Sequence, residues 1–142
     1  MNENAELLNH IYKNSQIGLH SMELLKERIN DPNFLAHCNA QMGKYGTIHR
    51  RAEEILHDSG HDDRTLRQIS KAPAGTAILL ENLRSDNLPH AAEIMMQGST
   101  RGVIETTKNI KRCRDANPDI LLLATELLQT EENNAQQMRS FL

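Results

Sequence analysis

Residues 4–32 read NAELLNHIYKNSQIGLHSMELLKERINDP, and this stretch decides the class of the fold. Apolar or small residues recur in it at spacings of three and four, which is the pattern of a helix with one buried side. Asp31 then offers a side-chain acceptor, and Pro32 cannot continue the first helix but suits the first turn of another. The stretch therefore predicts a long helix, a turn and a second helix. The inward positions predicted for the first helix are Leu8, Ile11, Ser15, Gly18, Met22, Leu25 and Ile29.

Three further helices are predicted by the same spacing. The second covers about 32–57 and is followed by Asp58-Ser59-Gly60, in which glycine is the natural capping residue. The third covers about 89–113, and the fourth starts at Asn117-Pro118 and runs to about 142. Their predicted inward positions are Leu35, Cys38, Met42, Tyr45, His49, Ala52 and Leu56; then Ala92, Met95, Ser99, Gly102 or Val103, Thr106, Ile110 and Cys113; then Ile120, Ala124, Leu127, Glu131, Ala135, Met138 and Leu142.

The composition supports one all-α domain over residues 1–142. The chain is 38% hydrophobic and 25% charged but only 3% aromatic, so its core must be built mainly from Leu, Ile, Met and Ala, which suit packed helices. A net charge of −3 gives no reason to expect nucleic acid or an anionic membrane as a partner. No apolar stretch approaches the roughly 20 residues that span a bilayer, and the polar start lacks the pattern of a signal peptide. We therefore expect a cytoplasmic protein.

The connection between the second and third helices, residues 61–88, sets the expected topology. It is too long for a hairpin turn and reads as a broken helix, interrupted near Pro73 and Gly75. A bundle helix of about 26 residues is roughly 39 Å long, and a connection of this length can traverse it. The second and third helices would then be parallel, which is the one-crossover plan of ferritin-like four-helix bundles rather than the up-down-up-down plan. Parallel placement would put Cys38 and Cys113 at opposite ends of the bundle, too far apart for a disulfide.

Two segments carry a resemblance to a known group of proteins. They are AEIMMQGSTRG at residues 92–102 in the third helix and TEENN at residues 130–134 in the fourth. In these segments the chain resembles uncharacterised bacterial helical proteins of ferritin-like type, and the resemblance covers nearly the whole chain. It implies the fold, but neither segment is a catalytic signature.

Ferritin-like proteins that hold two metal ions need Glu on two helices and Glu-x-x-His on the other two. Here that spacing occurs once, at Glu54 and His57 in the last turn of the second helix. The fourth helix has Asn134 where a histidine would be needed after Glu131, so a complete di-iron site is not expected.

His49 and Glu131 are the main candidate site residues, because both are polar and both fall on predicted inward positions. A buried carboxylate must be paired, hydrogen-bonded or protonated, and a neighbouring imidazole would favour the charged form of each. One interpretation is a structural pair, with Tyr45 or Ser99 as further hydrogen-bond partners, and the other is a site for a single metal ion or small ligand. Small residues at mid-helix either leave a pocket beside this pair or let helices approach closely. These residues are Ser15, Gly18, Ser99 and Gly102.

The remaining polar residues give weaker indications. The run from His57 to Asp63 is interpreted as a solvated helix end, and Cys38 and Cys113 as inert buried thiols. No grouping suggests nucleophilic catalysis, and no glycine-rich phosphate loop occurs. The other histidines outside that run fall off the inward positions and are predicted to lie on the surface: His10, His20, His37 and His90.

The segment from Ile120 to Ala124 is apolar all round, so one face of a bundle cannot cover it. The crossover leucines Leu79, Leu80 and Leu83 can do so, or a second copy of the chain can, and we expect a homodimer. Together these features favour a non-catalytic bundle that acts as a binding or assembly module without a cofactor. The alternative is a metal-binding ferritin-like protein, with oxidase or storage activity, that holds iron or another divalent metal at His49 and Glu131.

Overall fold

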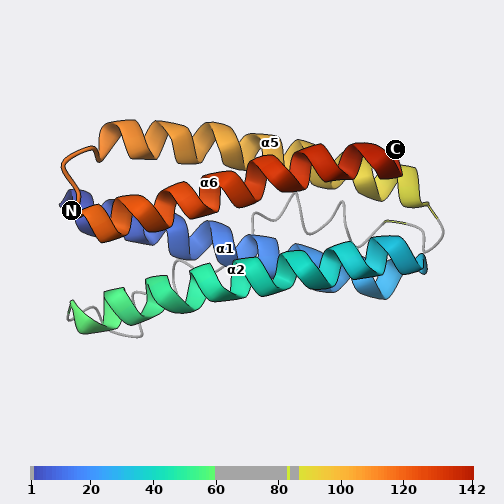
Figure 1. Cartoon of the computed structure of the whole chain (residues 1–142), viewed down its shortest axis with the longest axis horizontal. Coiled ribbons are helices and arrows are strands. Elements are labelled where there is room, and N and C mark those ends of the chain that lie inside the picture. Colours follow the sequence, from blue (N-terminus) through green and yellow to red (C-terminus); the bar gives the residue numbers. More distant parts are fainter. Residues whose placement is uncertain (1, 60–82, 84–86) are drawn as a thin grey trace.

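The computed structural model describes residues 2–59, 83 and 87–142 and shows an all-helical bundle (Figure 1). Its long helices are α1 (Glu3–Arg28), α2 (Pro32–Asp58), α5 (Leu88–Arg112) and α6 (Pro118–Met138), and a short 3-10 turn, η1 (Arg139–Phe141), ends the chain. No strand occurs in these residues. None of the described helices is both long enough and apolar enough to cross a bilayer.

Side chains of Asn and Asp fix the starts of three helices. Asn2 accepts a hydrogen bond from the Ala5 amide at 2.8 Å, and Asp31 accepts one from Phe34 at 2.9 Å. Each such cap stabilises a helix by about 1 kcal/mol. Asn87 caps α5 in the same way, and the predicted starts at Asp31-Pro32 and Asn117-Pro118 are confirmed. The predicted cap at Gly60 lies outside the described residues.

The ends of the helices establish their directions. At one end of the bundle, the backbone amides of Asp115 and Asn117 donate hydrogen bonds to the side chains of Glu3 and Asn4. At the other end, the ring of Phe34 at the start of α2 meets the ring of Phe141 edge-on at 5.3 Å. Accordingly, α1 and α6 run one way and α2 and α5 the other (Figure 1).

These directions match the predicted one-crossover plan, since α2 ends and α5 begins at opposite ends of the bundle (Figure 1). The cysteines agree with it. Cys113 lies beside Glu3 and Glu6 at the start of α1, whereas Cys38 lies within electrostatic range of Lys26 at the far end of α1. Both are free buried thiols. The predicted helical content of the crossover falls on residues outside the described part.

The buried face of α1 is the one that the sequence predicts, whereas the buried face of α2 differs from the prediction. Every predicted inward residue of α1 is buried. On α2, however, Leu35, Met42 and His49 are only half-buried. Their neighbours in the sequence face the core instead because α2 packs against both α1 and α6, which turns its buried face toward those two helices. These buried neighbours are Phe34, Gln41 and Ile48, and His37, next to Cys38, is buried as well.

The apolar start of α6 is covered on most sides. Leu123 and Leu127 are fully buried and Leu121 packs against the core, while Leu122 remains 56% exposed. Leu83, one of the three crossover leucines in the prediction, is buried in the same core, and the other two lie outside the described residues. The homodimer stays a prediction, which light scattering can check.

Candidate functional site

A cavity of about 180 Å³ opens between α1 and α5 and extends inward to α2 and α6. Its inner end is formed by Tyr45, Ser99 and Glu131, which are nearly or fully buried. The half-buried Glu105 and the exposed Arg101 lie at its opening. The remaining lining residues are Asn14, Ile17, Gly18 and Ser21 from α1 and Ile94, Met95, Gly98 and Gly102 from α5.

Two glycines make room for the polar side chains at the inner end. A Cβ atom on Gly18 would lie 2.6 Å from the ring of Tyr45, and one on Gly102 would lie 3.0 Å from the carboxyl group of Glu131. Real Cβ atoms essentially never show the first distance and seldom show the second, so α1 and α5 each offer bare backbone to the side chain of another helix. The small residues predicted at these positions therefore accommodate Tyr45 and Glu131 and also line a cavity.

Glu131 is the dominant electrostatic feature of the cavity. Its side chain is 6% exposed, and burial raises the pKa of its carboxyl group from 4.5 to about 7. Tyr45 and Ser99 donate hydrogen bonds to it and oppose this rise without cancelling it. Burial together with the neighbouring carboxylate raises the pKa of Tyr45 well above its ordinary value, so its hydroxyl remains a donor. Near neutral pH, Glu131 thus changes charge inside the bundle.

A chain of hydrogen bonds holds Ser99 in place. His37 donates from Nε2 to the amide oxygen of Asn134 at 2.8 Å, and the amide nitrogen of Asn134 donates to Ser99 Oγ at 2.7 Å. Ser99 therefore accepts from Asn134, and its own hydrogen remains available to Glu131 or to the Tyr45 hydroxyl. Gln41 lies one helical turn from His37 and is also buried, and its side-chain oxygen has no partner within the described part of the chain.

The structure does not bring His49 and Glu131 together. His49 lies on the α1 side of α2, where its Nδ1 donates to the carbonyl oxygen of Tyr12 at 3.3 Å and lies 3.2 Å from Ser15 Oγ. Its ring packs against the ring of Tyr12 in a tilted arrangement, with the ring centroids 4.3 Å apart. Burial lowers the pKa of His49, which favours a neutral ring in this place. His49 thus belongs to the α1–α2 contact, and the cavity contains Glu131 with Tyr45 and Ser99.

The secondary metal candidates, Glu54 and His57, are exposed at the end of α2. Across residues 2–59, 83 and 87–142, no group of three or more His, Cys, Asp or Glu side chains has the arrangement needed to hold a metal ion. Burial raises the pKa of both thiols, to about 11 for Cys38, which keeps them protonated.

A second polar cluster surrounds His10 where α1 meets α5. The amide nitrogens of Asn14 and Asn109 donate to His10 Nδ1 at 3.0 and 3.3 Å, so its hydrogen lies on Nε2, which donates to Thr106 at 2.8 Å. Burial lowers the pKa of His10 to about 4, and a proton on Nδ1 would also confront both amide donors. The prediction that His10 and His37 lie on the surface was wrong. His37 is buried and His10 is half-buried, and each forms a hydrogen bond with a residue far away in the sequence.

We expect His10→Gln to reduce the loss in free energy of unfolding that the wild type shows as the pH falls from about 6.5 to about 4. The pKa of His10 is lower in the folded protein than in the unfolded chain, so the unfolded chain binds a proton first as the pH falls. The free energy of unfolding of the wild type therefore decreases by about 3 kcal/mol between about pH 6.5 and about pH 4. Urea unfolding at several pH values measures this loss. His20→Gln, at an exposed position of the same helix, is the matched control. An equally steep acid loss in His10→Gln and the wild type would contradict the assignment.

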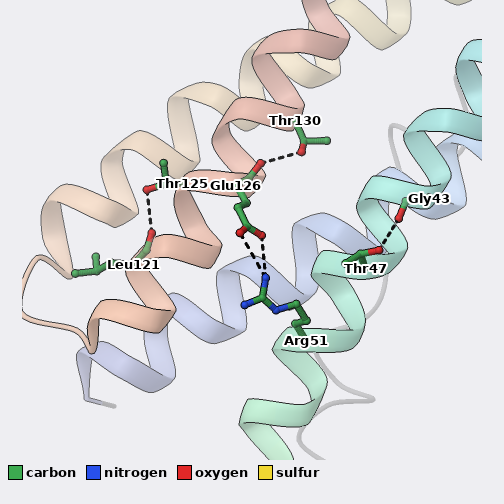
Figure 2. Close-up of polar contacts among 7 residues, drawn as sticks. All are labelled: Gly43, Thr47, Arg51, Leu121, Thr125, Glu126 and Thr130. Carbon is green, nitrogen blue, oxygen red and sulfur yellow. Dashed lines mark hydrogen bonds and ion pairs between the residues drawn. The ribbon is translucent and has the colours of Figure 1, made fainter.

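A groove of about 720 Å³ lies between α2 and α6 and is lined in part by Gly43, Thr47, Glu126 and Thr130. The two threonine hydroxyls donate to carbonyl oxygens of their own helices, those of Gly43 and Glu126 (Figure 2). Arg51 joins α2 to Glu126 by an exposed ion pair at 3.2 Å, which is worth less than about 1 kcal/mol. The groove is a polar surface feature, whereas the cavity at Glu131 has a buried titrating group.

No protein-family model, curated protein or solved structure matches the chain. The resemblance to ferritin-like proteins therefore stays a prediction, and the cavity at Glu131 is the feature of the chain that bears on function.

Proposed function

We propose that the chain is a non-catalytic helical bundle, of ferritin-like connectivity, that binds a small molecule in the cavity at Glu131. The observation that carries this proposal is a carboxyl group held almost fully buried at the inner end of a cavity that opens to the surface. A carboxyl group in such a place weakens the fold, because its charged form has lost most of its water. Perturbed titrating groups in clefts are typical of functional sites. Glu131 has two hydrogen-bond donors but no charged partner in the described part of the chain, and a ligand is expected to supply the missing interaction.

Further support comes from the way the cavity is built. Side chains from four helices meet there, and the binding groups Tyr45, Ser99 and Glu131 lie on long helices rather than loops. Ser99 is in turn fixed through Asn134 and His37. Rigid helices and supporting hydrogen bonds of this kind hold polar groups in position before a ligand arrives.

A screen of small molecules by amide NMR on the full chain tests the proposal. We expect at least one molecule to shift the amides of Gly18, Ser99 and Gly102 in a saturable manner. Gly98→Leu should weaken that binding, since Gly98 lines the cavity and has open space at its Cβ position. Gly43→Leu is the matched control, because its Cβ position on α2 is equally open and it does not line this cavity. A screen in which no molecule shifts these amides would contradict the proposal.

Elemental analysis of the same preparation separates this proposal from the metal-binding alternative. The small-molecule proposal predicts no stoichiometric metal. One metal ion per chain that is retained in His49→Ala and lost in Glu131→Gln would place a metal in the cavity and overturn it.

A further inference from the structure

The ligand-binding role proposed above leaves open what kind of molecule Glu131 would recognise. The groups in contact with its carboxyl group are two hydroxyl donors, Tyr45 and Ser99. No cationic side chain in the described part of the chain contributes to its pKa, so nothing there balances its negative charge. At the opening, Arg101 and Glu105 carry opposite charges, and α1 contributes no charged residue to the lining. An uncompensated carboxyl group is thus the one charged feature at the inner end.

The size and walls of the cavity limit the ligand further. A volume of about 180 Å³ is below the roughly 300–1,000 Å³ of sites for drug-sized molecules, so the ligand has on the order of ten non-hydrogen atoms or fewer. Between the opening and the carboxyl group, Ile17, Ile94 and Met95 provide apolar wall. Oxygen atoms gather at the inner end, where the hydroxyls of Tyr45 and Ser99 can accept hydrogen bonds in addition to Glu131, and Ser21 adds a further hydroxyl to the lining.

We propose that this cavity binds a small organic monocation, of the class of a primary ammonium with a short apolar tail, whose charged head pairs with the Glu131 carboxylate. The inference depends on the proposed function, since it assigns the chemistry of the same site. A primary ammonium has three N–H donors, and the inner end offers the carboxylate and two hydroxyl oxygens as acceptors. A buried ion pair stabilises a complex only when such further hydrogen bonds are made. An anionic ligand would instead face Glu131 with a like charge.

Binding of such a cation is coupled to release of a proton. Near neutral pH part of the protein carries Glu131 as a neutral carboxylic acid, since burial raises its pKa to about 7. An ammonium ion selects the carboxylate, so the carboxyl proton leaves to solvent while the ammonium keeps its own protons and no covalent bond to the ligand forms. Affinity should therefore rise about tenfold between pH 6 and pH 8. Tyr45 stays protonated over this range, and Arg101 and Glu105 lie at the opening rather than against Glu131.

Three probes of similar shape and different charge test the inference on the full chain. They are isopentylamine, isopentanol and isovalerate, each titrated by amide NMR and calorimetry at pH 6 and pH 8. We expect isopentylamine to shift the amides of Gly18, Ser99 and Gly102 and to bind at least about tenfold more tightly than isopentanol, with isovalerate weakest. Glu131→Gln should weaken the amine at least about tenfold and leave the alcohol within about twofold. Calorimetry in two buffers of different ionisation enthalpy should detect the released proton.

The outcomes separate the two proposals. If isopentanol binds as tightly as isopentylamine, or if Glu131→Gln keeps the affinity for the amine, the cationic ligand is wrong and the binding cavity stands. The same holds if the amine does not bind while other small molecules shift the cavity amides. If nothing shifts these amides, both the cationic ligand and the ligand-binding role are wrong.

Discussion

Glu131→Gln is expected to stabilise the protein by about 3 kcal/mol at pH 8 and to leave its stability at pH 4 nearly unchanged. The folded pKa of Glu131 is raised from 4.5 to about 7. The unfolded chain therefore loses this proton at lower pH than the native protein, and native stability falls as the pH rises from about 4.5 to about 7. Glutamine has nearly the same shape, carries no charge and can still accept hydrogen bonds from Tyr45 and Ser99.

Urea unfolding at pH 4, 6 and 8 measures this difference. Glu132→Gln, at the adjacent exposed position of α6, is the matched control for removing one negative charge. A Glu131→Gln protein that is less stable than the wild type at pH 8 would show that the native bundle gains from the charge. Stabilisation would instead identify Glu131 as a residue whose presence opposes folding, as is common for groups that serve binding.

Gly18→Ala is expected to destabilise the protein by about 2 to 3 kcal/mol, which is the upper range for overpacking a core. The new methyl group would lie 2.6 Å from the ring of Tyr45, a side chain that is 1% exposed and cannot move into solvent. Any displacement of Tyr45 would also weaken its hydrogen bond to Glu131. We therefore expect the variant to lose both stability and the shape of the cavity.

Gly43→Ala is the matched control for Gly18→Ala, since both residues lie within long helices and only Gly18 has a neighbour at its Cβ position. We expect Gly43→Ala to stabilise the protein by up to about 1 kcal/mol, because alanine favours the helix over glycine. Denaturant unfolding of both variants measures the contrast. A Gly18→Ala protein as stable as Gly43→Ala would show that the close contact with Tyr45 is absent in solution.

Much of the fold could be predicted because its determinants are local. The spacing of apolar and small residues identified the buried side of α1, and the Asp-Pro and Asn-Pro pairs marked two helix starts. The length of one connection then predicted that α2 and α5 are parallel. Each of these inferences depends on residues close together in the sequence or on a simple length.

The candidate site could be predicted only in part. Glu131 was placed inward and Gly18, Ser99 and Gly102 were suspected to border a pocket, because they interrupt otherwise apolar sides of helices. The association of Glu131 with His49 could not be tested by spacing. His49 points to α1 and Glu131 contacts α2 and α5 residues, a difference set by how far each helix is rotated in the bundle.

His37 and Asn134 were missed for a related reason. Polar residues are predicted to be exposed unless they interrupt an apolar pattern. These two can be buried because their side chains form a hydrogen bond with each other, although they lie 97 positions apart in the sequence. Gln41 on the same face of α2 was also missed, although its side-chain oxygen has no partner within the described residues. Only the packing of α2 against α6 reveals such pairs, so a single sequence does not contain the signal.

The central claim is that Glu131 is a buried carboxyl group that changes charge near neutral pH within an open cavity. NMR titration of the Glu131 side-chain carboxyl carbon in the 142-residue chain tests it directly. The structure predicts a pKa of about 7, because burial opposes the charged form more than Tyr45 and Ser99 favour it. A titration midpoint at or below the ordinary 4.5 would mean that the carboxylate is already compensated in the native protein, and it would contradict both the assigned site and its cationic ligand.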